Sequence, residues 1–198
     1  MKLIWKGKMT TDNLFIPDNI PDSAKLLSSE KYTWLAYLLV VPILAIAYAG
    51  IVIRRPYVVG IAFNKIAFFI GVGLSIVFLV VHELIHALCC PRDTTVFVYL
   101  TSAGIGCVPA CGLKKNRYLL VALMPTIVLG VIPFIIWICF PGMNVIISSI
   151  LFAFSIGSLS MCVGDIYNAF LAAFKMNRRS VLVTSKTDIY YYNEYPLR

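Results

Sequence analysis

The sequence predicts an all-α membrane protein with four transmembrane helices, a short β-like hairpin or re-entrant loop after the second helix, and a strand-like C-terminal tail. Sixty per cent of its 198 residues are hydrophobic and only 13% are charged, whereas soluble domains average roughly 45–50% apolar and 25% charged residues. Four apolar stretches are also long enough to cross a bilayer, which takes about 20 residues for each helix.

The four predicted spans cover approximately residues 34–53, 66–90, 118–140 and 145–174. With four spans, the N-terminal segment, the second loop and the C-terminal tail share one side of the membrane, and that side holds 14 of the 17 basic residues. Under the positive-inside rule we therefore expect a multi-pass protein of the cell membrane with both termini in the cytoplasm. The basic residues lie outside the spans and form no aromatic–basic array, so we expect contact with anionic lipid and not with nucleic acid.

The same pattern divides the chain into a cytoplasmic N-terminal segment (1–31), a four-helix transmembrane domain (32–175) and a cytoplasmic tail (176–198). Within the loop 91–117, residues 94–101 are β-branched and aromatic, and 102–106 supply a turn, which predicts a hairpin or extended loop. Residues 180–184 and 188–192 look strand-like and are predicted to pair. The six cysteines lie in the cytosolic loop or in spans, so free thiols are expected.

The second span ends in a metal-binding motif, His82-Glu83-Leu-Ile-His86. Residues four apart share one face of a helix, so the two imidazoles can bind one Zn²⁺ while Glu83 stands beside the water that is to be deprotonated. These are the only two histidines in the chain, and they lie where lipid-facing residues are otherwise expected. Ionisable groups inside a span are functional hypotheses by default, although buried polar contacts are the alternative.

Zinc needs a third protein ligand, and the acidic residues indicate which one. Only Glu83 and Asp165 of the nine acids fall within apolar runs. Counted from the extracytoplasmic side, Asp165 lies at the same depth as His86, near the cytoplasmic end of its span. No Lys or Arg shares that depth, so a bound cation is the expected partner of an ionised Asp165, with a neutral structural carboxyl as the alternative.

Three further residues bear on access and orientation. Asn168 lies one turn after Asp165 and is predicted to orient that carboxylate or to donate a hydrogen bond to the reacting carbonyl, with helix packing as the other explanation. Pro125 in the third span and Gly164 in the fourth can kink or loosen their helices, although packing is the commoner role of such residues.

Together, the motif that closes a span, the extended segment after it, the proline in the third span and Gly164-Asp165 in the fourth resemble a small bacterial membrane family of zincin peptidases. That family is similar to the site-2 proteases, which implies an intramembrane zinc held by His82, His86 and Asp165, with Glu83 as the catalytic base. Site-2 proteases usually carry Asn-Pro-x-x-Asp-Gly at the last ligand, whereas this chain reads Met161-Cys-Val-Gly-Asp165-Ile.

The expected function is therefore zinc-dependent hydrolysis of peptide bonds in a transmembrane protein or a hydrophobic peptide. In this mechanism Glu83 accepts a proton from the attacking water and returns it to the leaving amine. Two alternatives belong to other classes: an ion- or proton-binding membrane protein that uses the same side chains, and a non-catalytic membrane scaffold.

Overall fold

The computed structural model describes residues 1–10, 12–17, 20–57, 63–101 and 104–193. The chain forms two compact units that are interleaved along the sequence. Unit 1 comprises residues 1–34, 83–124 and 165–198, and unit 2 comprises residues 35–82 and 125–164.

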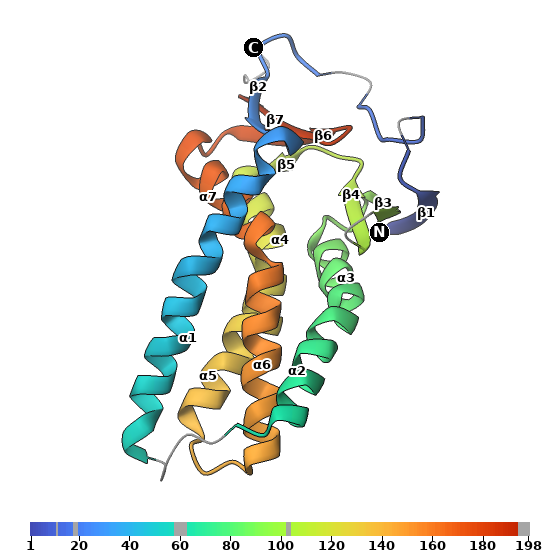
Figure 1. The fold of residues 1–198 in the computed structure, drawn as a ribbon. Coiled ribbons are helices and arrows are strands. Elements are labelled where there is room, and N and C mark those ends of the chain that lie inside the picture. The colour runs from blue at the N-terminus through green and yellow to red at the C-terminus, as the bar shows by residue number, and fades with distance from the viewer. Residues whose placement is uncertain (11, 18–19, 58–62, 102–103, 194–198) are drawn as a thin grey trace. The chain divides into compact units, whose positions relative to one another are not determined.

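Unit 2 is a bundle of apolar helices, shown side by side in Figure 1. It contains the second half of the 3-10 helix η1 (Glu30–Leu39), α1 (Val40–Arg54), the 3-10 turn η2 (Arg55–Tyr57), α2 (Lys65–Val77), the start of α3 (Leu79–Cys89), the π-helical segment η3 (Thr126–Val131), α5 (Ile132–Cys139) and α6 (Val145–Met161). The π-helical segment directly follows Pro125, which has no N–H to donate to the preceding turn, so the helical hydrogen-bond pattern changes at that residue.

Close packing in unit 2 depends on small and aromatic residues. Gly71 of α2 lies so near α6 that an added Cβ would sit only 2.8 Å from the Cβ of Ala153. At one end of the bundle, Trp137 is fully buried and packs against Phe134 and Phe152. Arg54 stacks over Trp137 and donates hydrogen bonds to the Ser148 hydroxyl and to two loop carbonyls. These donors satisfy polar groups that would otherwise be buried without partners.

Three helical segments of the described residues are long and apolar enough to cross a membrane: Trp34–Tyr57, Lys65–Cys89 and Lys115–Cys139. The pair α6 and α7 (Val163–Lys175) adds a fourth if it is one broken span. Most of the large side chains on these segments are exposed to the surroundings, among them Val41, Phe69 and Ile135. This combination is consistent with a membrane protein whose helices face lipid.

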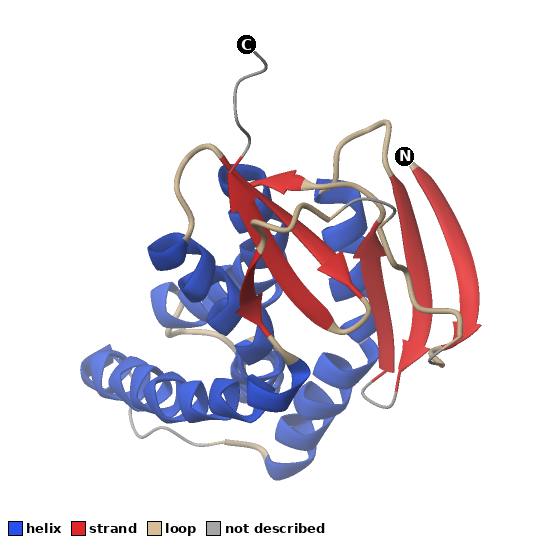
Figure 2. Ribbon diagram, turned by 90° about the horizontal axis from the view of Figure 1, so that it is seen from above, coloured by secondary structure: helices blue, strands red, loops and turns tan. Residues whose placement is uncertain are grey.

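Unit 1 contains two small β-sheets, which Figure 2 shows as the red arrows. The first, sheet A, has the order β1-β3-β4, from β1 (Lys2–Lys8), β3 (Thr95–Thr101) and β4 (Gly104–Pro109). The second, sheet B, has the order β2-β7-β6-β5, from β2 (Lys25–Ser28), β5 (Leu113–Lys114), β6 (Ser180–Ser185) and β7 (Asp188–Asn193). In sheet A, β1 runs parallel to β3, while β4 is antiparallel to β3.

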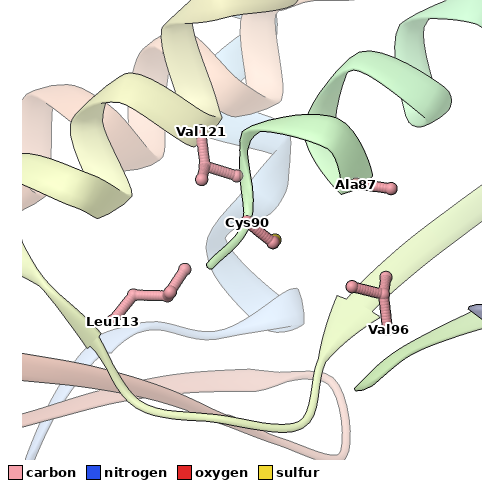
Figure 3. Packing of buried hydrophobic residues seen from close by; sticks show 5 residues of the cluster. All are labelled: Ala87, Cys90, Val96, Leu113 and Val121. Carbon is pink, nitrogen blue, oxygen red and sulfur yellow. The ribbon is translucent and has the colours of Figure 1, made fainter. Parts of the chain in front are cut away.

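The helices of unit 1 are most of α3, α4 (Lys115–Pro125) and most of α7. A core joins them to the sheets: Ala87 of α3, Cys90, Val96 of β3, Leu113 of β5 and Val121 of α4 gather in the region shown in Figure 3. A second cluster, Leu27, Ala172, Met176 and Leu182, joins α7 to sheet B. The short connection from α3 to β3 thereby fixes sheet A beside the end of the helix that carries the histidines.

The predicted hairpin and the paired tail strands are confirmed. β3 pairs antiparallel with β4, and β6 with β7; the first two residues of the expected turn, 102–103, lie outside the described residues. The all-α class was too narrow, because the chain is mostly helical but carries two sheets. The N-terminal segment, for which the sequence analysis named no strand, supplies β1 and β2, which pair with strands about ninety and one hundred and sixty residues further along the chain.

Candidate metal centre

The two motif histidines project from α3. His82 is buried with 6% of its surface exposed, and Glu83 and His86 are half-buried. A helix repeats every 3.6 residues, so the side chains of His82 and His86 leave the same face one turn apart. His82 is the last residue of unit 2 and the sequence neighbour of Glu83, and α3 runs through both residues as one helix.

The His86 ring is oriented by a backbone group of unit 1. Its Nδ1 lies 2.8 Å from the carbonyl oxygen of Val121 in α4. A carbonyl oxygen only accepts hydrogen bonds, so Nδ1 carries the proton and donates it. The lone pair of a neutral His86 is then on Nε2, which lies 3.4 Å from the Oδ2 atom of Asp165. The lone pairs of these two atoms repel each other at this distance, unless a cation lies between them or Nε2 carries a proton.

Asp165 lies in the first turn of α7, one turn before Asn168 on that helix. The first-turn N–H groups of a helix have no acceptor within it and carry partial positive charge, so they favour a carboxylate. Asp165 is half-buried, with 29% of its side chain exposed. The start of α7 therefore presents an acidic side chain to His86 at a position that suits an ionised carboxylate.

The imidazole ring of His82 contacts a cysteine. Its Nδ1 lies 3.5 Å from the Sγ atom of Cys162, a fully buried residue that ends α6. A partner at Nδ1 leaves Nε2 as the atom that can bind a metal, as is usual for metal-ligating histidines.

These three residues fit a zinc ion. The ligand atoms of His82, His86 and Asp165 all lie within 4.8 Å of one another. Zinc bonds of about 2.0–2.1 Å to nitrogen and about 2.0–2.2 Å to oxygen, at a tetrahedral angle, place two ligand atoms about 3.4 Å apart. The separation of His86 Nε2 from Asp165 Oδ2 has this value. Two imidazoles and one carboxylate are also the donor set of many catalytic zinc sites, which leave one position open.

Glu83 contacts a residue of sheet A. The thiol of Cys107, in β4, is hydrogen-bonded to the Glu83 carboxylate. Burial, and then the nearby carboxylate, raise the pKa of Cys107 to about 12. Cys107 is therefore a neutral thiol at physiological pH and can donate its S–H to Glu83.

A cavity of about 360 Å³ lies beside the acidic and imidazole groups of unit 1. Its walls are mostly apolar and come from α3, β4, α4, α7 and sheet B; they include His86, Asp165, Asn168, Cys107, Tyr118 and Ile189. The Oδ1 atom of Asn168 is buried and has no hydrogen-bond partner among the described residues. A cavity of this size, apolar with a few polar groups on one wall, is typical of a small-ligand or peptide site.

The structure thus brings His82, His86 and Asp165 together, and places Asn168 on the wall of the cavity beside Asp165. Sequence reasoning missed three contacts: Val121 to His86, Cys162 to His82, and Cys107 to Glu83. The first is a backbone carbonyl, for which a sequence holds no signal. The two cysteines were predicted only to be free thiols, and only the folded structure reveals that they lie beside the motif.

A family model described as putative zincin peptidase matches residues 75–181, which is more than half of the chain and includes the motif, β3, β4, α6 and α7. No curated protein and no solved structure matches the chain.

Proposed function

The chain belongs to the family of putative zincin peptidases, and on that premise we propose that it is a membrane-embedded zinc peptidase. Its substrates would be transmembrane segments of other proteins or hydrophobic peptides, as in the site-2 proteases. The observation that carries this proposal is the approach of Asp165 Oδ2 to 3.4 Å from His86 Nε2, next to a helix face that also bears His82.

His82, His86 and Asp165 would be the three protein ligands of the zinc. A bound zinc ion supplies Lewis acid chemistry: it polarises a carbonyl group and makes water acidic enough to be deprotonated near neutral pH. The Val121 carbonyl holds the His86 ring in the tautomer that leaves Nε2 unprotonated. The Sγ atom of Cys162 lies beside Nδ1 of His82, as the Val121 carbonyl lies beside Nδ1 of His86. Such outer contacts fix ring orientation and raise the basicity of the ligand.

Glu83 would be the general base and then the general acid. It follows His82 directly on α3, so its carboxylate projects beside the ligand face. In the forward step it accepts a proton from the attacking water, and after attack it donates that proton to the departing amine. The hydrogen bond from the Cys107 thiol restrains the carboxylate in the orientation needed for both transfers.

The apolar cavity would hold the substrate in an extended form. β4 is an edge strand of sheet A, and its residues Cys107, Val108 and Pro109 line the cavity next to His86. An edge strand offers unpaired backbone groups to an extended peptide, which aligns the scissile bond. Asn168, whose Oδ1 has no hydrogen-bond partner among the described residues, is available to bind the peptide backbone near Asp165.

Replacing Glu83 with Gln is the direct test, because Gln has nearly the same shape but cannot accept a proton. Glu83→Gln protein, purified in detergent, is expected to retain bound zinc and to lose cleavage of membrane-protein substrates while still capturing them. Asp22→Asn, which removes an exposed acid outside the site, is the matched control and should behave as wild type.

Two outcomes would contradict the proposal. Wild-type protein that binds no zinc under gentle extraction would favour a non-catalytic scaffold. Zinc binding without hydrolysis in wild type, together with ion flux that Glu83→Gln abolishes, would favour an ion-binding membrane protein.

A further inference from the structure

We propose that strand β1 docks on the lipid surface, with Leu3 and Trp5 inserted at the boundary of headgroups and acyl chains and with Lys8 on an anionic headgroup. The partner is thus an anionic phospholipid interface. This inference rests on the proposed membrane location of the chain, but not on its peptidase activity.

The register of sheet A places the relevant side chains on one face. Leu3 pairs with Val96, Trp5 with Val98 and, after a bulge, Lys8 with Leu100. Paired residues on neighbouring strands project from the same side of a sheet, and successive residues alternate. Leu3, Trp5 and Lys8 therefore share a face with Val96.

That face is turned toward the end of α3. Val96 is fully buried and packs in the cluster that includes Ala87 of α3, as Figure 3 shows. Cys107 of β4 projects from the same face, because it pairs with Val98, and it contacts Glu83 of α3. The inner strands are thus covered by the helix.

β1 extends past this cover. It is the outermost strand of sheet A, beside the N-terminus in Figure 2, and it leaves 47% of Leu3 and 59% of Trp5 exposed. On α3 itself, Leu84 and Leu88 are exposed as well, on a segment long and apolar enough to cross a membrane. Apolar side chains of β1 and of the end of α3 are therefore both exposed.

The other face of sheet A is already covered by the chain. Phe97 packs against Phe15 with ring centres 5.3 Å apart, and Lys6 lies over the Phe97 ring. The Tyr99 hydroxyl donates a hydrogen bond to the Asn13 carbonyl. The segment that follows β1 thus protects one face, while the face with Leu3 and Trp5 is left exposed.

Charge favours lipid over an apolar protein partner. β1 carries three exposed lysines and no acid, and Arg92 is exposed beside the N-terminus, where its carbonyl accepts a hydrogen bond from the Met1 amino group. Asp93 is the neighbouring acid. Trp is enriched at membrane–water interfaces, and basic residues near an anionic leaflet are attracted to its headgroups. A tryptophan beside lysines on an exposed edge strand has both properties.

The test uses the full chain reconstituted in vesicles of phosphatidylcholine and phosphatidylglycerol, with acyl chains brominated either near the headgroup or near the bilayer centre. Bromine quenches tryptophan fluorescence on contact, and the difference between wild type and Trp5→Phe isolates the signal of Trp5. We expect loss of that signal with the shallow bromine and little loss with the deep bromine. The variant Lys2→Gln/Lys8→Gln should reduce the quenching when phosphatidylglycerol is present.

The difference between wild type and Trp34→Phe serves as a control, because Trp34 belongs to a candidate span. A Trp5 signal that aqueous acrylamide quenches and neither bromolipid affects would overturn the inference. Protection of Trp5 that disappears when the protein is diluted in the membrane would overturn it too, since a second copy would then be the partner. Loss of peptidase activity in any preparation has no bearing on this result, so the two proposals fail separately.

Discussion

Replacing Asp165 with Asn should weaken zinc binding about 100- to 1,000-fold. Structural zinc sites with four protein ligands bind with about 10–16 kcal/mol, or about 2.5–4 kcal/mol for each ligand. By the usual relation of free energy to Kd, that loss is about 100- to 1,000-fold. The full value is expected because the 3.4 Å separation from His86 Nε2 already suits tetrahedral zinc, so Asp165 binds without rearrangement.

The assay is competition for zinc between the purified protein in detergent and a chromophoric chelator. Asn keeps the size of the side chain and its carbonyl oxygen but not the charge, so a change in affinity reports ligation and not packing. Asp22→Asn is the matched control for a lost charge elsewhere. An Asp165→Asn protein that binds zinc within a few-fold of wild type, while His86→Ala loses it, would refute the assignment of Asp165 as a ligand.

Three other predictions concern the thiols and the packing of the bundle. Cys107→Ala should lower kcat about 10-fold with little change in KM, because a hydrogen bond to a charged group is worth about 1.5 kcal/mol, and Cys107→Ser should restore most of the rate; equal losses in both variants would contradict a role in positioning Glu83. Burial raises the pKa of Cys90 to about 11 and contributes most to the pKa of about 12 for Cys107, so their alkylation by maleimide should be slow at neutral pH and rise about tenfold per pH unit as thiolate forms; a rate independent of pH would be inconsistent with these pKa values. Gly71→Ala should lower the free energy of unfolding by about 1–3 kcal/mol in thermal unfolding, because its Cβ would meet the backbone of α6; Gly73→Ala, whose Cβ would meet nothing within 4 Å, should be neutral or stabilising, and similar losses in both would show that the close approach is unimportant.

Much of the candidate site could be predicted because it depends on local rules. The ligand face of α3 follows from the spacing of His82 and His86 on a helix, and Asp165 follows from the cost of a lone carboxylate within an apolar run. Neither argument requires knowledge of tertiary contacts. Contacts to Glu83 could not be predicted in this way, since Cys107 reaches it only through the register of β4 with β3.

The fold likewise has features that local sequence predicts and features that depend on tertiary contacts. The long apolar helices were recognisable from the length of the apolar runs, and the hairpin and tail strands from β-branched and aromatic residues between turns. The pairing of β1 with β3 joins residues 2–8 to residues 95–100. β1 is rich in lysine and follows no clean apolar alternation, so it becomes a strand only because an edge of β3 is available for pairing. Its tertiary context overrides its propensity.

The break between α6 and α7 places Asp165, the acidic candidate ligand, at the start of a helix. Cys162 ends α6 with its N–H shared between the carbonyls of Ser158 and Leu159, so the helical ladder tightens and stops there. α7 then begins at Val163, and Asp165 falls in its first turn. In an unbroken helix this carboxylate would lie against a turn whose N–H groups are all used, and keeping it ionised would be costly. At a helix start the first-turn N–H groups have no acceptor within that helix and carry positive partial charge, and the thiol of the same Cys162 lies beside His82. One residue thus both ends α6 and contacts a candidate metal ligand, which explains how a carboxylate can be kept within an otherwise apolar segment.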